Sequence, residues 1–215
     1  MKKKELEQRS YNFEIRAEET EQGNIITGRP IVYDSKTDLG WFDEIIERGA
    51  LNGADLTDVR FLVNHDLSKI PLARSRRNNG NSTMQLTPDE RGMAIKVLLD
   101  TENNTEARSL YSAVQRGDIS GMSFMFAIKD EEWDDLDQEH PTRRIKSIST
   151  VVEVSAVTFP AYDTTEINAR SKEALESARQ AVETARTQKA GAQVETRDKN
   201  NLELEKAKFE FITKI

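Results

Sequence analysis

Residues 143–160 read RRIKSISTVVEVSAVTFP, and this valine-rich stretch predicts a strand that ends at Pro160. Glu153 lies in the middle of the valines. Burying a carboxylate among apolar side chains is costly unless the carboxylate is paired. Glu153 therefore either faces solvent from a one-sided sheet or has a buried partner, such as the N–H group of a neutral imidazole.

Two other predicted strands carry a polar side chain of interest. VRFLVNHD, residues 59–66, predicts a buried strand that ends at His65, one of only 2 histidines in the chain. In GMSFMF, residues 121–126, strand alternation puts the large apolar side chains on one face. Ser123 lies on the other face beside small residues, which leaves room for a substrate backbone to approach. Ser120 is the alternative serine in this region.

Other segments have clear local signals. A helical spacing of apolar residues over 104–116, followed by Gly117, predicts a helix that stops at this glycine. Pro30 lies within a strand candidate and predicts a sheet edge or a bulge. The remaining predictions are strands over residues 11–17 and 24–35, a hairpin over 83–100, and loops over 73–82 and 130–141.

The chain is expected to form one body with an extension at each end. Residues 1–9 predict a disordered basic leader, residues 10–168 a folded body, and residues 169–215 a charged helical tail with a thin apolar stripe. We expect an α+β body with a mostly antiparallel sheet curled into a barrel and helices packed outside. Curling would remove the exposed edges that many short strands otherwise leave.

The composition excludes several kinds of site and partner. The 215 residues carry a net charge of -7, which disfavours nucleic acid as a partner because phosphate contacts dominate that affinity. The chain has no cysteine, which excludes disulfides, thiolate zinc sites and cysteine nucleophiles. Because no signal peptide and no apolar run of about 20 residues occur, a cytoplasmic protein without membrane contact is expected. No phosphate-loop or dinucleotide motif occurs, so no cofactor is predicted.

His65, Ser123 and Glu153 together are the residue types of a serine hydrolase. A serine hydroxyl is a weak nucleophile at neutral pH and needs a base within hydrogen-bond reach. Histidine can be that base, and a carboxylate on its other ring nitrogen fixes the tautomer and stabilises the imidazolium. The chain has no GxSxG motif, which disfavours an α/β-hydrolase.

Four stretches occur in an order that resembles the phage prohead proteases. These are capsid-maturation serine proteases whose fold is similar to that of the herpesvirus assembly proteases. The stretches are FDEIIERGAL (residues 42–51), FLVNHD (61–66), RGDISGMSFMF (116–126) and EVSAVTFPAYDTT (153–165). The resemblance covers residues 10–168 and implies that this body is a protease domain with a herpesvirus-protease-like fold.

The family resemblance assigns roles to three residues. It implies His65 as the catalytic base, Ser123 as the nucleophile and Glu153 as the acidic third member. The herpesvirus relatives use a second histidine in the third role, which makes His140 a competitor of Glu153. The acidic, proline-flanked loop around His140 is a poor place to hold a rigid orienting group.

The resemblance also implies a function and partners. The protease would be packaged inside the immature capsid, or prohead, in the host cytoplasm. There it would cleave the N-terminal scaffolding segment from the major capsid protein and digest itself. The tail would serve as an incorporation tag or a self-cleavage region. The herpesvirus relatives dimerise, so a second copy of the chain is a further candidate partner.

Two other functions are left open by the residues. A non-enzymatic scaffolding or assembly protein of the prohead would fit the polar composition and the charged tail. A metal-dependent hydrolase would use His65, Asp66 or His140 as ligands, but no HExxH motif or paired-histidine spacing occurs. We therefore predict a serine endopeptidase with no bound metal.

Overall fold

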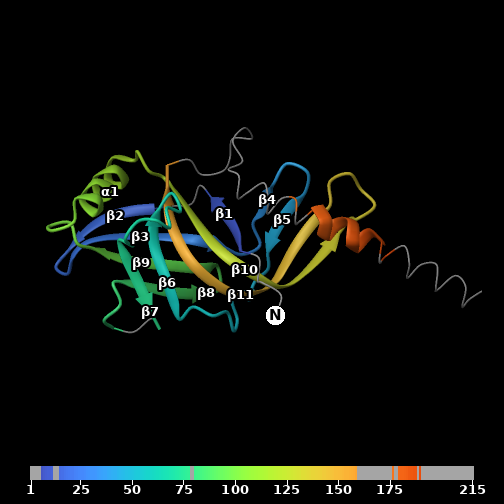
Figure 1. The fold of residues 1–215 in the computed structure, drawn as a ribbon, viewed down its shortest axis with the longest axis horizontal. Coiled ribbons are helices and arrows are strands. Elements are labelled where there is room, and N and C mark those ends of the chain that lie inside the picture. The colour runs from blue at the N-terminus through green and yellow to red at the C-terminus, as the bar shows by residue number, and fades with distance from the viewer. Residues whose placement is uncertain are drawn as a thin grey trace, which may run out of the picture.

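The structure is a computed structural model, and it describes residues 6–11, 15–77, 80–158, 176, 179–187 and 189. Strands dominate these residues (Figure 1). In chain order the elements are β1 (Glu7–Tyr11), β2 (Ile15–Thr20), β3 (Gly23–Val32), β4 (Lys36–Asp38), β5 (Asp43–Ile46), β6 (Asp58–Val63), β7 (Ala73–Arg76), β8 (Met84–Asp89), β9 (Gly92–Leu99), α1 (Thr105–Arg116), β10 (Gly121–Asp134) and β11 (Thr142–Val157).

The long hairpin of β10 and β11 is the centre of the first sheet. The two strands pair antiparallel, and β1 pairs antiparallel with the outer edge of β10. The other edge of β11 has two parallel partners: residues 142–145 pair with β5, and residues 153–156 pair with β6. β4 extends the sheet beyond β5, and β7 extends it beyond β6. β11 therefore holds together strands that lie far apart in the sequence.

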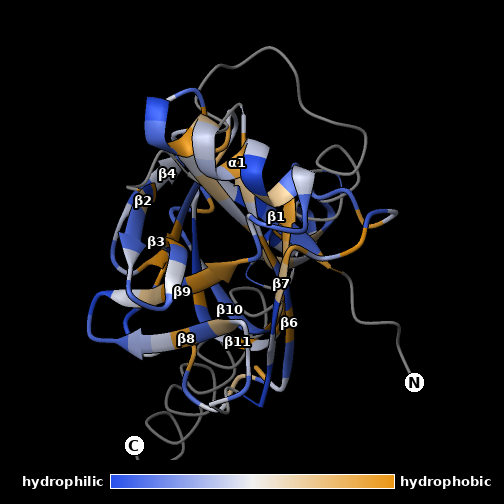
Figure 2. Ribbon diagram, turned by 90° about the vertical axis from the view of Figure 1, so that its left-hand side faces the viewer, coloured by the Kyte–Doolittle hydropathy of each residue, from blue (hydrophilic) through white to orange (hydrophobic). Residues whose placement is uncertain are grey.

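The second sheet contains β2, β3, β9 and β8 in this order, and all of its neighbours are antiparallel. In Figure 2 these strands lie on one side of the molecule and β6 and β7 on the other, with α1 at one end. A continuous apolar core joins the two sheets. It includes Ile26, Ile31, Ile95 and Val97 from the second sheet and Phe61, Phe124, Phe126 and Val154 from the first.

The local sequence of α1 explains both of its ends. The side chain of Asn104 accepts hydrogen bonds from two backbone N–H groups of the first turn, at 2.9 and 3.2 Å, which caps the helix. Gly117 ends the helix in the left-handed conformation, with a φ of 81°. The residues that face the core are Ala107, Leu110 and Val114. The helix predicted over residues 104–116 is confirmed.

The sheets differ from the prediction in one respect. The predominance of strands with a flanking helix agrees with the α+β class. Within the described residues, however, the strands form two open sheets and no closed barrel. Barrel closure does not protect the edges here. Instead, β1 covers the outer edge of β10, and the two sheets pack over a shared core.

Two predicted loops are partly strands. In the basic stretch 73–82, β7 pairs with β6, and Arg74 Nε lies 2.5 Å from an Asp58 carboxylate oxygen across that pair. In the acidic stretch 130–141, β10 continues to Asp134, whose carboxylate lies 2.5 Å from Arg144 Nε on β11. Both pairs are diagonal neighbours in their strand registers. Opposite charges at such positions stabilise the pairing, so both stretches extend although their composition predicts loops.

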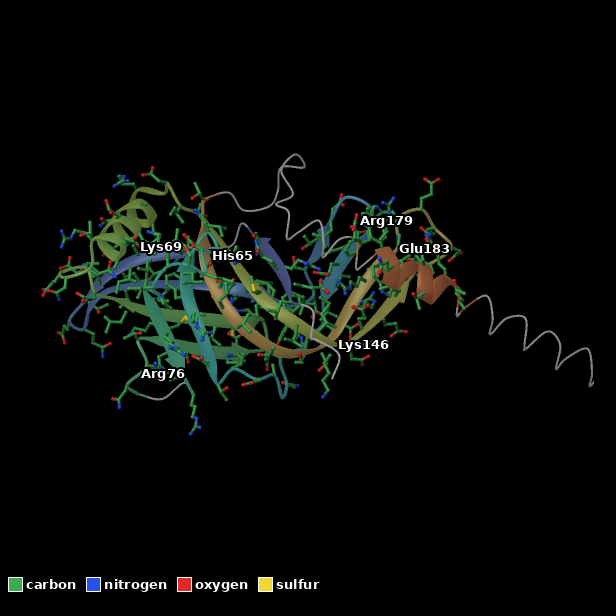
Figure 3. All side chains as sticks on the ribbon, viewed as in Figure 1. His65, Lys69, Arg76, Lys146, Arg179 and Glu183 are labelled. Carbon is green, nitrogen blue, oxygen red and sulfur yellow. The ribbon has the colours of Figure 1, made fainter. Side chains whose placement is uncertain are left out.

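The predicted leader and tail lie partly outside the described residues. β1 begins at Glu7, so residues 7–9 of the predicted leader are part of a paired strand. Residues 179–187 of the predicted tail are helical, and the labelled Arg179 and Glu183 show this segment beside the β10–β11 hairpin (Figure 3). The boundary at residue 168 is outside the described residues and stays a prediction.

The helical segment 179–187 contacts the body. Val182 is buried, and the Arg186 guanidinium donates to the backbone oxygens of Leu136 and Gln138 at 2.8 and 3.0 Å. This part of the tail is therefore anchored to the turn between β10 and β11. No helix in the part of the chain that the structure describes is long and apolar enough to span a membrane.

Pro30 and Gly92 mark one irregular point in the second sheet. The register of β3 against β9 shifts between Gly28 and Ile31, so the bulge predicted at Pro30 is confirmed. Opposite this bulge, Gly92 has a φ of 136°, and a Cβ there would lie 2.0 Å from the carbonyl oxygen of Ile31. Only glycine fits this conformation and this space.

We predict that Gly92→Ala lowers the free energy of unfolding by about 2–4 kcal/mol, because the added methyl group meets backbone and φ is unfavourable. Gly53→Ala is the matched control: its φ is 77°, but nothing lies within 4 Å of the added Cβ. The control should cost only about 1–2 kcal/mol. Urea unfolding of both variants measures the difference, and equal losses would contradict the close approach at Gly92.

Candidate active site

The register of the first sheet brings three distant segments together. Ser155 of β11 is paired with Ser123 of β10 on one side and with Leu62 of β6 on the other. Glu153 lies two residues before Ser155 and therefore on the same face of β11. His65 follows the end of β6 by two residues, near the upper end of that strand in Figure 3. The sheet thus places His65, Ser123 and Glu153 on neighbouring strands.

The three side chains form one continuous hydrogen-bonded row. His65 Nε2 lies 2.5 Å from Ser123 Oγ, and His65 Nδ1 contacts Glu153 Oε1. Ser123 and Glu153 are fully buried, and His65 is 9% exposed. An imidazole held between a hydroxyl and a carboxylate in this way can accept the hydroxyl proton while the carboxylate balances the resulting charge.

Ser155 is a member of this site that the sequence reasoning missed. Its Oγ donates to Glu153 Oε2 at 2.7 Å and accepts the backbone N–H of His65 at 3.0 Å. Both carboxylate oxygens of Glu153 therefore have a partner, which is the condition for burying this charge at a tolerable cost. The signal in the sequence was the i, i+2 spacing, which puts Ser155 and Glu153 on one face of a strand.

The backbone turns sharply where it presents His65. Asn64 and His65 both have positive φ angles, of 50° and 58°, which is unfavourable for residues other than glycine. Asn64 is held by its backbone N–H, which donates to Ala156 at 3.0 Å. Its side chain also exchanges two hydrogen bonds with Thr158, at 3.1 and 3.0 Å. These contacts to the end of β11 fix the turn that aims the imidazole at Ser123.

β1 covers the hydroxyl of Ser123. Ser10 of β1 is paired with Ser123 in the sheet register and donates to its Oγ at 2.8 Å. Ser123 Oγ also lies 2.7 Å from the carbonyl oxygen of Arg9, to which it can donate. The strand therefore lies directly over the atom that would act as the nucleophile, and Ser123 has no exposed surface.

Two side chains of β1 belong to a buried cluster of charges. The Arg9 guanidinium contacts both carboxylate oxygens of Glu44 on β5, at 2.5 and 2.6 Å. Arg143 on β11 contacts both oxygens of Glu7, at 2.8 Å each, and Glu131 on β10. No local pattern in the sequence predicts this cluster, because its members come from four strands.

The cluster changes the pKa of the Glu7 carboxyl. Burial alone would raise the pKa of the Glu7 carboxyl, but the charges of Arg9 and Arg143 outweigh burial and lower it. Because the pKa is lowered in the folded chain, the stability that Glu7 contributes is present above the ordinary pKa range of glutamate. That contribution is lost as the pH falls through the lowered value.

A cavity of about 490 Å³ lies next to the site, between the end of β6 and α1. Lys69 and Glu106 pair at 2.7 Å and join its two walls. Apolar side chains form most of the lining: Leu62, Val63, Ile70, Leu72, Leu110 and Ile119. Because Asn64 also lines it, the cavity begins one residue away from His65.

The other histidine lies in a different environment. His140 Nε2 is 3.2 Å from Asp43 and 3.8 Å from Asp38, and its side chain is 41% exposed. Asp38, Asp43 and His140 are the group of possible metal-ligating side chains among the described residues. Asp43 is already paired with Lys36 at 2.5 Å. The imidazole of His65 is contacted by Glu153, and His140 is not part of that row.

We predict that Ser155→Ala lowers the free energy of unfolding by about 1–3 kcal/mol, because it leaves an oxygen of buried Glu153 and the N–H of His65 without their partner. Ser149→Ala, on the same strand, is the control. The half-buried hydroxyl of Ser149 donates to the carbonyl oxygen of Ala127 at 3.0 Å, so its loss should cost about 1 kcal/mol or less. Thermal or urea unfolding measures both. A smaller loss for Ser155→Ala than for the control would contradict the bridging role.

Comparison with protein families gives a match over most of the chain. The model of the family described as caudovirus prohead serine protease matches residues 4–180, which is most of the chain and includes His65, Ser123, Glu153 and Ser155. No curated protein and no solved structure matches the chain significantly. Because the family model spans well over half of the sequence, the chain belongs to the caudovirus prohead serine proteases.

Proposed function

We propose that this serine peptidase uses Ser123 as nucleophile, His65 as general base and Glu153 as the group that orients His65. The observation that carries the proposal is the buried row from Glu153 through His65 to Ser123. Ser155 is a positioning residue, since its hydroxyl bonds Glu153 and the backbone N–H of His65. An assembly protein without catalytic activity would have no need to bury an imidazole between a hydroxyl and a carboxylate.

The proposed reaction follows from this geometry. Ser123 Oγ attacks the carbonyl carbon of a peptide bond while its proton passes to His65 Nε2. The carboxylate of Glu153 stabilises the imidazolium through Nδ1. His65 then gives the proton to the leaving amine, and an acyl-enzyme forms. Water, activated by the same imidazole, hydrolyses the ester and restores Ser123.

The proposed substrate is the major capsid protein of the phage, and the proposed place is the interior of the prohead. Membership of the prohead protease family supports a capsid-protein substrate. We further propose that the enzyme removes a scaffolding segment from that protein and digests its own chain. The likeness of the fold to the herpesvirus assembly proteases, the homodimer and the role of the tail in incorporation stay predictions.

We predict that Ser123→Ala abolishes cleavage of the capsid protein, with a loss of about 10³- to 10⁶-fold in rate, because members of such a triad act as a unit. Ser120→Ala is the control. Ser120 is exposed and lies just before β10, so its loss should leave the rate unchanged. Incubation of each variant with purified capsid protein, followed by gel electrophoresis, measures both. Undiminished cleavage by Ser123→Ala would reject the proposed nucleophile.

Glu153→Gln tests the orienting carboxylate. The amide keeps the size of the side chain but cannot stabilise an imidazolium, so we expect kcat to fall by about 10³- to 10⁴-fold with little change in KM. Glu139→Gln in the exposed turn between β10 and β11 should leave kcat unchanged. Steady-state kinetics on one capsid-derived peptide compares the two variants. A change confined to KM would argue that Glu153 contributes to substrate binding instead.

A further inference from the structure

β1 occupies the place that a substrate strand would take. It pairs antiparallel with the outer edge of β10, and Ser10 lies directly opposite Ser123. Within the described residues, β1 is the edge strand of this sheet, so the edge of β10 that carries Ser123 is covered by five residues of the same chain. Extended peptides commonly bind proteins by adding a strand to a sheet edge in this way.

The peptide bond between Arg9 and Ser10 lies at the hydroxyl of Ser123. Ser123 Oγ is 2.7 Å from the carbonyl oxygen of Arg9 and 2.8 Å from Ser10 Oγ, and it also contacts His65 Nε2. A serine hydroxyl has one proton and two lone pairs. When that proton is donated to the carbonyl of Arg9, it is not available to His65. While this bond lasts, Ser123 does not act as a nucleophile, and attack begins when the proton turns to His65.

The side chain before this bond contacts a buried carboxylate of the body. The Arg9 guanidinium forms a bidentate contact with Glu44, which is 1% exposed. The guanidinium carbon also lies 5.7 Å from the centre of the Phe126 ring, where a cation is attracted. Glu44 belongs to β5 and Phe126 to β10, so both remain in the body when β1 leaves. A planar fork of this kind matches a carboxylate better than a lysine ammonium does.

The position two residues earlier has the opposite charge. Glu7 contacts Arg143 of β11 at 2.8 Å through both carboxylate oxygens. Removal of β1 would take away one carboxylate and one guanidinium, and would leave Glu44, Glu131 and Arg143 in the body. The buried Glu44 would then keep only a 3.4 Å contact with Arg143 among the cluster's guanidinium groups. A ligand strand that supplies a cation to Glu44 and an anion to Arg143 restores both pairs.

We infer that β1 is an internal substrate mimic and that Glu44 makes the enzyme select a basic residue immediately before the cleaved bond. Arg143 selects an acidic residue two positions before that basic residue. The preferred substrate is thus an extended peptide with the pattern acidic, any residue, basic, as in Glu7-Gln8-Arg9. This inference rests on the proposed role of Ser123.

The same geometry makes the Arg9–Ser10 bond a self-cleavage site. Ser123 Oγ attacks the carbonyl carbon of Arg9, and its proton passes through His65 to the nitrogen of Ser10, which leaves as an amine. Water then hydrolyses the Arg9 ester, which releases residues 1–9 with a free carboxyl group and restores the hydroxyl of Ser123. The loss of those residues uncovers the edge of β10 at Phe124, Met125 and Phe126, where residues 7–9 were paired, for the residues of a substrate that precede its cleaved bond.

Three peptides tested with the full-length enzyme decide the specificity. The first is LEQRSYNF, residues 6–13 of the chain, and the others replace its arginine by lysine or glutamine. We expect cleavage between arginine and serine, a smaller rate for lysine, and kcat/KM lower by about 10- to 100-fold for glutamine, the size expected for a lost hydrogen-bonded ion pair. Mass spectrometry of the enzyme itself should find a new N-terminus at Ser10.

Variants of the enzyme test the role of Glu44. Glu44→Gln should reduce the preference for arginine over glutamine by about 10-fold or more. Glu47→Gln, just beyond β5 and paired only loosely with Arg144 at 3.6 Å, should keep it. If Glu44→Gln does not fold, the ratio between the arginine and glutamine peptides with the wild-type enzyme still decides. Equal rates for those two peptides, or cuts in the capsid protein that follow non-basic residues, would overturn the inference.

The two proposals fail in different ways. Capsid-protein cleavage that depends on Ser123 but shows no preference for a basic residue overturns the role of Glu44 and leaves the serine peptidase mechanism in place. Cleavage that persists in Ser123→Ala overturns the mechanism and the inference together. An enzyme that cleaves LEQRSYNF but keeps its own residues 1–9 intact supports the role of Glu44 and rules out the self-cleavage of β1.

Discussion

The contact between the buried Glu153 carboxylate and the His65 imidazole is the constraint on which the site depends. A charge inside a valine-rich strand destabilises the fold unless its oxygens are bonded. Here one oxygen faces His65 and the other accepts the hydroxyl of Ser155. For both bonds to form, β11 must lie between β6 and β10, which is the arrangement that the sheet has. The contacts that Glu153 needs therefore require β11 to lie at the centre of the sheet.

This requirement explains why the sheet is mixed. Parallel pairing of β6 with β11 puts the end of β6 beside the end of β11, so His65 is delivered at the level of Glu153 and Ser155. Antiparallel pairing of β10 with β11 brings the start of β10, and with it Ser123, to the same level. The positive φ angles at Asn64 and His65 cost about 1–3 kcal/mol each. One or two buried hydrogen bonds offset such a cost.

Local patterns in the sequence anticipated the features that one segment determines by itself. The cap and stop of α1, the bulge at Pro30 and the anomalous carboxylate at Glu153 each follow from their near neighbours. The features that were missed depend on partners from elsewhere. β7 extends because Arg74 meets Asp58, and β10 continues because Arg144 meets Asp134. The pairing of β1 with β10 and the position of Glu44 could not be read from composition, because each depends on the register of strands that are far apart in the chain.

The charged cluster under β1 is a costly way to hold an edge strand. Burying two carboxylates and two guanidinium groups in mutual contact gains little over apolar side chains of the same size, because desolvation offsets the attraction. Five apolar residues on β1 would bind the edge of β10 at least as well and would be hard to remove. A strand held by ion pairs is different: the body keeps Glu44 and Arg143, and any strand with matching charges in the same register can take the place of β1. The use of charge instead of apolar contact at this edge thus fits the proposed exchange of β1 for a substrate strand beside Ser123.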